Sequence, residues 1–180
     1  MEKQLATFGG GCFWCTEAIF KELKGVEKIV SGYSGGKIKD PAYHEVSEGT
    51  TGHAESIQIT FDPKIISFKE LLEVFFLTHN PTTPDRQGND IGPQYRSVIF
   101  YHDAEQKKSA EKVKRKLEGE KVYDSPIVTE LIPFENFYPA ESYHQDYFVK
   151  NPDQPYCQFV ISPKLAKFRQ KFSSLLKKAA

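Results

Sequence analysis

The amino-acid sequence predicts an α+β fold, a two-layer sandwich in which helices pack on a mixed β-sheet. The first observation is the order of the predicted elements, strand–helix–strand–strand–helix–strand, which matches the split βαβ (ferredoxin-like) arrangement. The second is the alternation of apolar and polar residues in 54–62. The third is a helix with one apolar face that begins at Ser67.

The first elements surround a run of three glycines. A short strand is predicted for 4–8, a helix for about 13–24, and a second strand for 26–33. The glycines at 9–11 separate the first strand from the helix and indicate a tight turn. Cys12 would therefore lie at the start of the helix.

The next strand and helix have the clearest patterns. Ile57, Ile59 and Phe61 alternate with polar residues, which is the period of a strand with one buried face. Ser67 then begins a helix, with Glu70 in the capping-box position. The apolar face of this helix comprises Phe68, Leu71, Leu72, Phe75 and Phe76.

The second half of the chain completes the sheet. A strand is predicted for 96–101, and Asp103 is the N-cap candidate of a charged helix that ends near 118. A further strand (128–132) and a last helix (165–176) follow. Two long connections, 32–55 and 79–95, are rich in Gly, Pro and Asn and carry aromatic residues and carboxylates. Long loops in a compact domain are commonly functional, so we expect these two to build a site.

Length and composition limit the possible functions. The 180 residues predict one domain, residues 1–180. Its 24 basic residues balance 24 acidic ones, which argues against a nucleic-acid-binding protein. We find no apolar run long enough to cross a membrane and no signal-peptide pattern at the start, so we expect a cytoplasmic protein that does not bind membranes.

The cysteines carry the most specific chemical signal. At a helix N-terminus, unpaired N–H groups and the helix dipole favour the thiolate, so we expect a lowered pKa for Cys12. Phe13 and Trp14 would form an apolar wall suited to a small group such as a methyl on sulfur. Cys15 lies one turn further on, so a Cys12–Cys15 dithiol is geometrically possible. Zinc is the weaker alternative and no metal is expected, because only Cys157 remains as a further thiol ligand.

Glu55 and His144 are the other candidates from the residues alone. Glu55 continues the buried face of the 54–62 strand, where burial would raise its pKa and keep it protonated as a general acid. The alternative is that the strand frays before this residue, which then points to water. Among the histidines, only His144 lies in a polar, aromatic-rich segment near the third cysteine.

Seven segments in order resemble peptide methionine sulfoxide reductase of the A type. They are GCFWC, GYSGG, YHEV, TGHAE, QGNDIGPQYRS, YHQDY and NPDQPYC, and the resemblance extends over nearly the whole chain. The resemblance implies reduction of methionine S-sulfoxide, free or in proteins, and hence repair after oxidative stress. It also implies the α+β sandwich fold, no metal or organic cofactor, and regeneration by thioredoxin. A monomer is expected.

The resemblance also implies roles for individual residues. Cys12 would attack the sulfoxide sulfur and become a sulfenic acid, while Glu55 protonates the oxygen. Tyr43 and Tyr95 would donate hydrogen bonds to that oxygen, and Asp90 would support the polar network. Phe13 and Trp14 would hold the methyl group, with His144 as a further binding residue.

The chain departs from the common pattern of this family at its other cysteines. Many relatives have glycine at the position of Cys15 and two cysteines in a glycine-rich tail, where this chain has only Cys157. The family pattern makes Cys157 the resolving thiol, with Cys15 or direct reduction by an outside thiol as alternatives. The segment CQFVI looks like an ordered, partly buried strand rather than a flexible tail. The competing functions are a general CxxC dithiol–disulfide oxidoreductase and a zinc-binding module.

Overall fold

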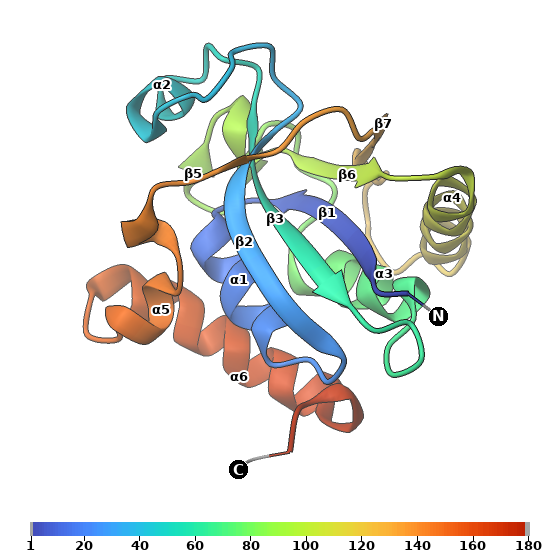
Figure 1. The fold of residues 1–180 in the computed structure, drawn as a ribbon. Coiled ribbons are helices and arrows are strands. Elements are labelled where there is room, and N and C mark those ends of the chain that lie inside the picture. The colour runs from blue at the N-terminus through green and yellow to red at the C-terminus, as the bar shows by residue number, and fades with distance from the viewer. Residues whose placement is uncertain (1, 179–180) are drawn as a thin grey trace.

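The computed structural model describes residues 2–178 and contains a six-stranded sheet in the order β7-β6-β1-β3-β2-β8 (Figure 1). Its strands are β1 (Gln4–Gly10), β2 (Val26–Ser34), β3 (Ala54–Phe61), β6 (Ser97–Tyr101), β7 (Glu130–Pro133) and β8 (Tyr138–Pro139). A separate hairpin comprises β4 (Arg86–Gln87) and β5 (Asp90–Ile91). The helices are α1 (Phe13–Lys21), α2 (Tyr43–Ser47), α3 (Phe68–Thr78), α4 (Ala104–Gly119), α5 (Tyr147–Lys150) and α6 (Ser162–Lys171). Single helical turns are η1 (Pro93–Tyr95), η2 (Ser142–His144), the π-helix η3 (Cys157–Ile161) and η4 (Ser173–Leu175).

The strand order confirms the predicted split βαβ arrangement. β3 lies between β1 and β2 and pairs antiparallel with both, while β6 pairs antiparallel with β1 on the other side. Because α1 connects β1 to β2, it must cross over β3. The sheet is mixed because β6 and β7, which are joined through α4, pair in parallel.

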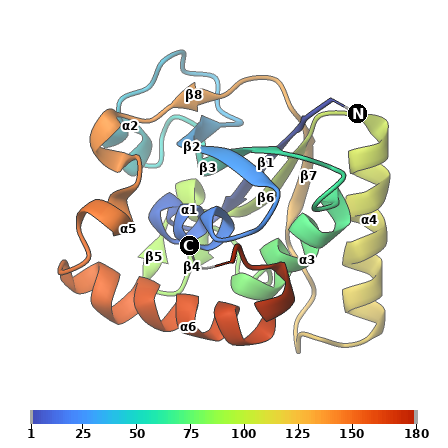
Figure 2. The same ribbon diagram turned by 60° about the horizontal axis from the view of Figure 1, so that its bottom comes forward.

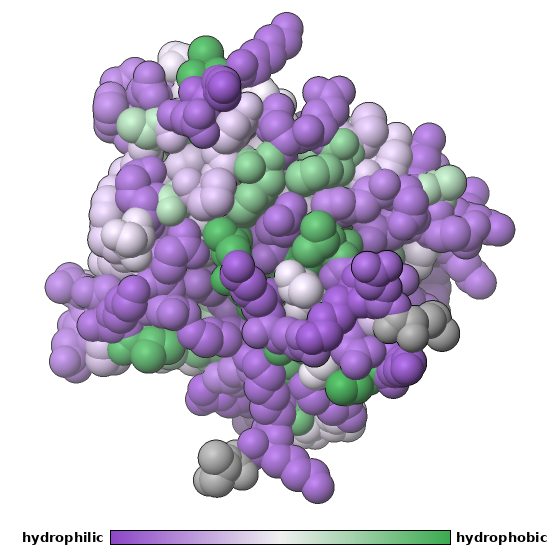
Figure 3. Space-filling model, in the orientation of Figure 1, coloured by the Kyte–Doolittle hydropathy of each residue, from purple (hydrophilic) through white to green (hydrophobic). Residues whose placement is uncertain are grey.

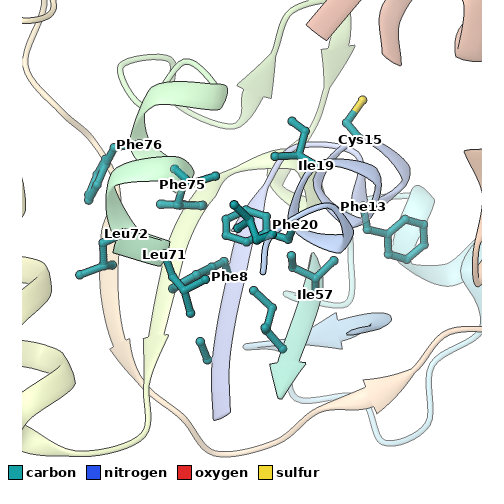
Figure 4. Packing of buried hydrophobic residues seen from close by; sticks show 14 of the residues in the cluster. Phe8, Phe13, Cys15, Ile19, Phe20, Ile57, Leu71, Leu72, Phe75 and Phe76 are labelled. Carbon is teal, nitrogen blue, oxygen red and sulfur yellow. The ribbon is translucent and has the colours of Figure 1, made fainter. Parts of the chain in front are cut away.

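One face of the sheet is covered by α1 and α3, which lie behind it in the view of Figure 1. Phe8 of β1 packs between the two helices, with ring centroids 5.7 Å from Phe20 and 5.0 Å from Phe75 (Figure 4). The predicted start of α3 is confirmed. The N–H of Ser67 donates to Glu70 Oε2 at 2.7 Å, and the N–H of Glu70 donates to Ser67 Oγ at 3.2 Å.

The other face of the sheet has a small apolar cluster of Ala54, Val98 and Phe100, against which Ile132 and Phe134 pack. Figure 3 shows that polar residues predominate on the surface of this side. Within residues 2–178, no helix combines the length and apolar character that crossing a bilayer requires.

Three predictions of local structure need correction. The connections 32–55 and 79–95 contain α2, the β4–β5 hairpin and η1, whose short polar sequences have no periodic pattern. The predicted strand within CQFVI is wrong, because Cys157–Ile161 forms a π-helix that continues into α6 (Figure 2). Pro163 cannot donate a backbone hydrogen bond, and a π-turn just before it accommodates the missing bond. The last helix consequently begins earlier than predicted and ends at Lys171.

Candidate active site

Cys12 occupies the turn between β1 and α1 and is the N-cap residue of α1. Gly11 makes the turn with a φ of +94°, where a Cβ atom would lie 2.6 Å from Cγ of Gln87. The Cys12 side chain is 8% exposed. Gly11 therefore forms the strand-to-helix turn, Gly9 and Gly10 extend β1, and Cys12 lies at the start of the helix as predicted.

Glu55 of β3 lies at this same helix end, and its side chain is 2% exposed. Its Oε2 accepts a hydrogen bond from the backbone N–H of Phe13 at 3.0 Å. Burial raises the pKa of Glu55 to about 8; the hydrogen bond from Phe13 opposes this shift and the charge of Asp90 adds to it. The carboxyl group is thus largely protonated at neutral pH, as the alternation in β3 predicts.

Tyr43 and Tyr95 come from the two long connections. Tyr43 is the first residue of α2, and Tyr95 is the last residue of η1. Burial, followed by the charge of Glu55, raises the pKa of Tyr43 to about 12 and also raises the pKa of Tyr95. The charge of Cys12 contributes to both shifts. Both phenols therefore remain proton donors at neutral pH, within electrostatic reach of Glu55 and Cys12.

An aromatic group covers the first turn of α1. The indole of Trp14 stacks on Tyr147 at a centroid distance of 3.6 Å and donates from Nε1 to Nδ1 of His144 at 3.0 Å. The buried His144 ring lies against Phe13 and Tyr43, with centroid distances of 5.0 and 4.4 Å. Burial lowers the pKa of His144, so the imidazole is neutral at pH 7. Its Nε2 has no hydrogen-bond partner among residues 2–178.

The Cys12 and Cys15 thiols lie close enough to shift one another's pKa. Figure 4 shows the Cys15 side chain directed away from the phenylalanines of the core. The hydrogen bond from Cys12 lowers the pKa of Cys15 to about 7, against the opposing effect of burial. The positive charge of Lys164 and the hydroxyl of Tyr156, which is 3.6 Å from Cys15 Sγ, lower it further. Cys15 thus carries substantial thiolate character at neutral pH.

The prediction of a lowered pKa for Cys12 is wrong for this structure. Burial raises the pKa of Cys12, and so do its donated hydrogen bond to Cys15 and the charge of Glu55. At the start of α1, the N–H group of Phe13 is already bonded to Glu55. Cys12 therefore holds its proton more tightly than Cys15, and the negative charge of the pair resides mainly on Cys15.

Both thiols open onto a pocket of about 270 Å³. One wall is the hairpin segment 87–90, which includes Asp90, and the other includes Tyr156, Val160 and Lys164. The hydroxyl of Tyr156 donates to Oδ2 of Asp90 at 2.7 Å, so this tyrosine joins the two walls beside Cys15.

Cys157 is adjacent in sequence to Tyr156, but it does not line the thiol pocket. It is fully buried in the π-helix η3, where CQFVI is ordered as expected but helical. Burial raises the pKa of Cys157, and the charge of Cys15 raises it further. All three cysteines are free thiols.

The two thiols alone fit either a methionine sulfoxide reductase or a general dithiol–disulfide oxidoreductase. Comparison with known proteins distinguishes these alternatives. A family model described as peptide methionine sulfoxide reductase matches residues 4–176. The chain belongs to this family. A relative from Thermus thermophilus, named peptide methionine sulfoxide reductase MsrA, is 55% identical over 98% of this chain and 99% of its own.

Two solved structures extend the family assignment to the fold. The reduced form of Mxr1 from Saccharomyces cerevisiae has a TM-score of 0.81 and 38% identity, covering 87% of this chain and 90% of the yeast chain. Mxr1 in complex with Trx2 has a TM-score of 0.58 and 28% identity, covering 81% and 85% of the two chains. The predicted α+β fold is confirmed.

Sequence reasoning missed two residues of this reductase that contact or charge the thiol pocket, Tyr156 and Lys164. Tyr156 stands in the segment QPYC, so its position next to a cysteine was the available signal. Lys164 belongs to a basic helix whose placement against α1 is a tertiary effect that no local pattern reveals. Among residues 2–178, no group of three or more His, Cys, Asp or Glu side chains is arranged to hold a metal ion.

Proposed function

We propose that the chain reduces methionine S-sulfoxide, free or in proteins, with Cys12 as the nucleophile. The observation that carries this proposal is the buried, protonated Glu55 at the helix end that bears Cys12. A sulfoxide oxygen is a poor leaving group until it is protonated, so this reaction requires an acid beside the nucleophile. Tyr43 and Tyr95 supply two further proton donors beside it.

The reaction begins with the transfer of the Cys12 proton to Cys15. The Cys15 thiolate accepts the proton of Cys12, and the resulting Cys12 thiolate attacks the sulfoxide sulfur. Glu55 donates a proton to the oxygen, and the oxygen is transferred so that methionine and a Cys12 sulfenic acid form. The sulfur of methionine is reduced in this step, and the sulfur of Cys12 is oxidised.

The aromatic group beside Cys12 supports recognition of the substrate methyl. Phe13 and Trp14 supply an apolar wall, and His144 fixes the indole through its hydrogen bond. We propose a positioning role for His144, because its ring is buried and contacts Phe13 and Tyr43. Asp90 acts from the opposite wall, where it holds the hydroxyl of Tyr156.

We propose Cys15, rather than Cys157, as the thiol that resolves the sulfenic acid. Cys15 lies one helical turn from Cys12, and its lowered pKa makes it a ready nucleophile. Cys157 is fully buried in a helix and has a raised pKa, and both features oppose attack on Cys12. The Cys12–Cys15 disulfide forms with release of water, and thioredoxin then reduces it. The solved complex of yeast Mxr1 with Trx2 supports this choice of reductant.

The activity assay that tests this proposal compares the two sulfoxide epimers. We expect methionine to form from the S epimer, free or in a peptide, and not from the R epimer, with dithiothreitol or thioredoxin as the reductant. A dithiol oxidoreductase is the second candidate, favoured by the thiolate character of Cys15. Reduction of insulin disulfides without methionine formation would favour that candidate and contradict the proposal.

A further inference from the structure

A second hollow, of about 780 Å³, adjoins the pocket that contains the two thiols. Its walls are the end of α3, residue 87 of β4, the connection 122–125 and one face of α6, which runs along this side of the molecule in Figure 2. Gln87, Val160 and Lys164 line both the hollow and the thiol pocket. The hollow therefore adjoins the thiol pocket along these three residues, and the two together are called the groove.

The α6 wall of this groove is basic. Lys164, Lys167 and Lys171 lie three and four residues apart, which places them along one face of the helix. Within the described part of the chain, none of these three lysines forms an ion pair. Asp124 is the single carboxylate among the described residues that line the hollow. The groove therefore presents unbalanced positive charge to whatever enters it.

The groove also exposes apolar side chains beside these lysines. Phe159 is 78% exposed, an unusual state for a phenylalanine, and Val160 is 37% exposed. Phe172, which follows α6, contributes further apolar lining, whereas Phe168 is buried. A groove lined by both apolar and basic side chains suits an extended polypeptide with apolar and acidic residues.

We propose that this groove binds the segment of a protein substrate next to its methionine sulfoxide and selects segments with acidic side chains. The inference rests on the proposed function, because the groove ends at the thiols that would react with the sulfoxide. Lys164 and Lys171 are separated by seven helical rises, about 10 Å, which is the length of about three extended residues. The preferred acidic residues would thus lie about two to five positions from the sulfoxide. A folded partner generally needs a broad contact area of about 800 Å² rather than a groove.

The test uses three kinds of peptide, each with one methionine S-sulfoxide. Two further positions, two to five residues from the sulfoxide, are both Glu, both Gln or both Lys. Each kind is made with the pair before the sulfoxide and with the pair after it. The enzymes are the wild type, the double variant Lys167→Glu/Lys171→Glu, and the control Lys108→Glu/Lys112→Glu. The control has the same change of charge and the same spacing, but on exposed positions of α4 outside the groove. Dithiothreitol serves as the reductant, so that no protein partner is needed.

For the wild type and the control, we expect kcat/KM to fall in the order Glu, Gln, Lys on at least one side of the sulfoxide. The groove variant should lower the ratio of kcat/KM for the Glu peptide to kcat/KM for the Lys peptide by about tenfold. The reason is that two exposed positions then repel acidic residues and attract basic ones. High salt should reduce the preference of the wild type. All three enzymes should reduce free methionine S-sulfoxide at equal rates, since a free amino acid does not reach the groove.

Equal kcat/KM for the Glu and Gln peptides in the wild type would overturn the proposal, and so would equal shifts in the groove variant and the control. The assays are repeated with thioredoxin in place of dithiothreitol, and a defect of the groove variant that appears only with thioredoxin would also overturn the proposal and assign the groove to the reductant. Failure of the wild type to reduce free methionine S-sulfoxide would instead contradict the proposed function, so the two failures are distinguishable.

Discussion

Cys12→Ser is expected to abolish methionine formation, with a loss of at least about a thousandfold in kcat. A serine hydroxyl is far less acidic than a thiol, so the Cys15 thiolate cannot deprotonate it, and serine cannot form the sulfenic acid. The measurement is methionine released per enzyme in a single turnover without reductant.

The matched control is Cys157→Ser, which also replaces a buried cysteine but lies outside the pocket. We expect this variant to release one methionine per enzyme at the wild-type rate. Cys12→Ala adds a readout independent of activity: because the hydrogen bond from Cys12 is the largest cause of the low pKa of Cys15, that pKa should rise above about 7. The ultraviolet absorbance of the thiolate reports it. Wild-type turnover by Cys12→Ser would contradict the mechanism.

Glu55→Gln is expected to slow the chemical step by about 10²- to 10⁴-fold, the usual contribution of a general acid. In the wild type, activity should fall as the pH rises above about 8, because the pKa of Glu55 is raised to about 8 and the acid form is lost there. Glutamine keeps the shape of the side chain but has no acidic proton. The variant should therefore lose this alkaline decline in single-turnover rate, and a rate that still falls near pH 8 would assign the decline to another group.

The same substitution has a stability effect with a defined sign. Because the folded state raises the pKa of Glu55 from its usual value of 4.5 to about 8, folding favours the protonated form. The stability that the wild type derives from this proton is full below pH 4.5 and is lost as the pH rises to about 8. We expect the melting temperature of Glu55→Gln to exceed that of the wild type by a margin that widens over this interval. A constant margin would show that Glu55 is ionised throughout.

Local patterns in the sequence predicted the parts of the fold that depend on local physics. The alternation in 54–62 placed Glu55 on the buried face of β3, and Ser67 with Glu70 marked the start of α3. The apolar run in CQFVI suggested a strand, whereas Pro163 and the helix that follows impose a π-turn. That outcome depends on how the neighbouring residues continue the helix, which a five-residue pattern does not contain.

The sequence predicted which residues lie together in the site, but it did not predict the pKa values of the two thiols. Cys12 and Glu55 lie together because a strand-to-helix turn and a neighbouring strand meet, and both were recognisable in the sequence. The pKa of Cys12 was not predictable, because burial and the hydrogen bond to Cys15 arise only when α1 packs in the fold. The positive charge of Lys164, from a helix distant in sequence, lowers the pKa of Cys15 further. The segment GGGCFWC thus contains two thiols whose pKa values are shifted in opposite directions.

The identity of the disulfide formed after one turnover tests the central claim most directly, namely that Cys12 reacts and Cys15 captures the product. The enzyme is treated with one equivalent of methionine S-sulfoxide without reductant, alkylated, and digested with trypsin. Cleavage after lysine places Cys12 and Cys15 together in peptide 4–21, and Cys157 in peptide 151–164. We predict that peptide 4–21 contains an internal disulfide while Cys157 is alkylated. A cross-link between peptides 4–21 and 151–164 would contradict this account and make Cys157 a partner in the disulfide.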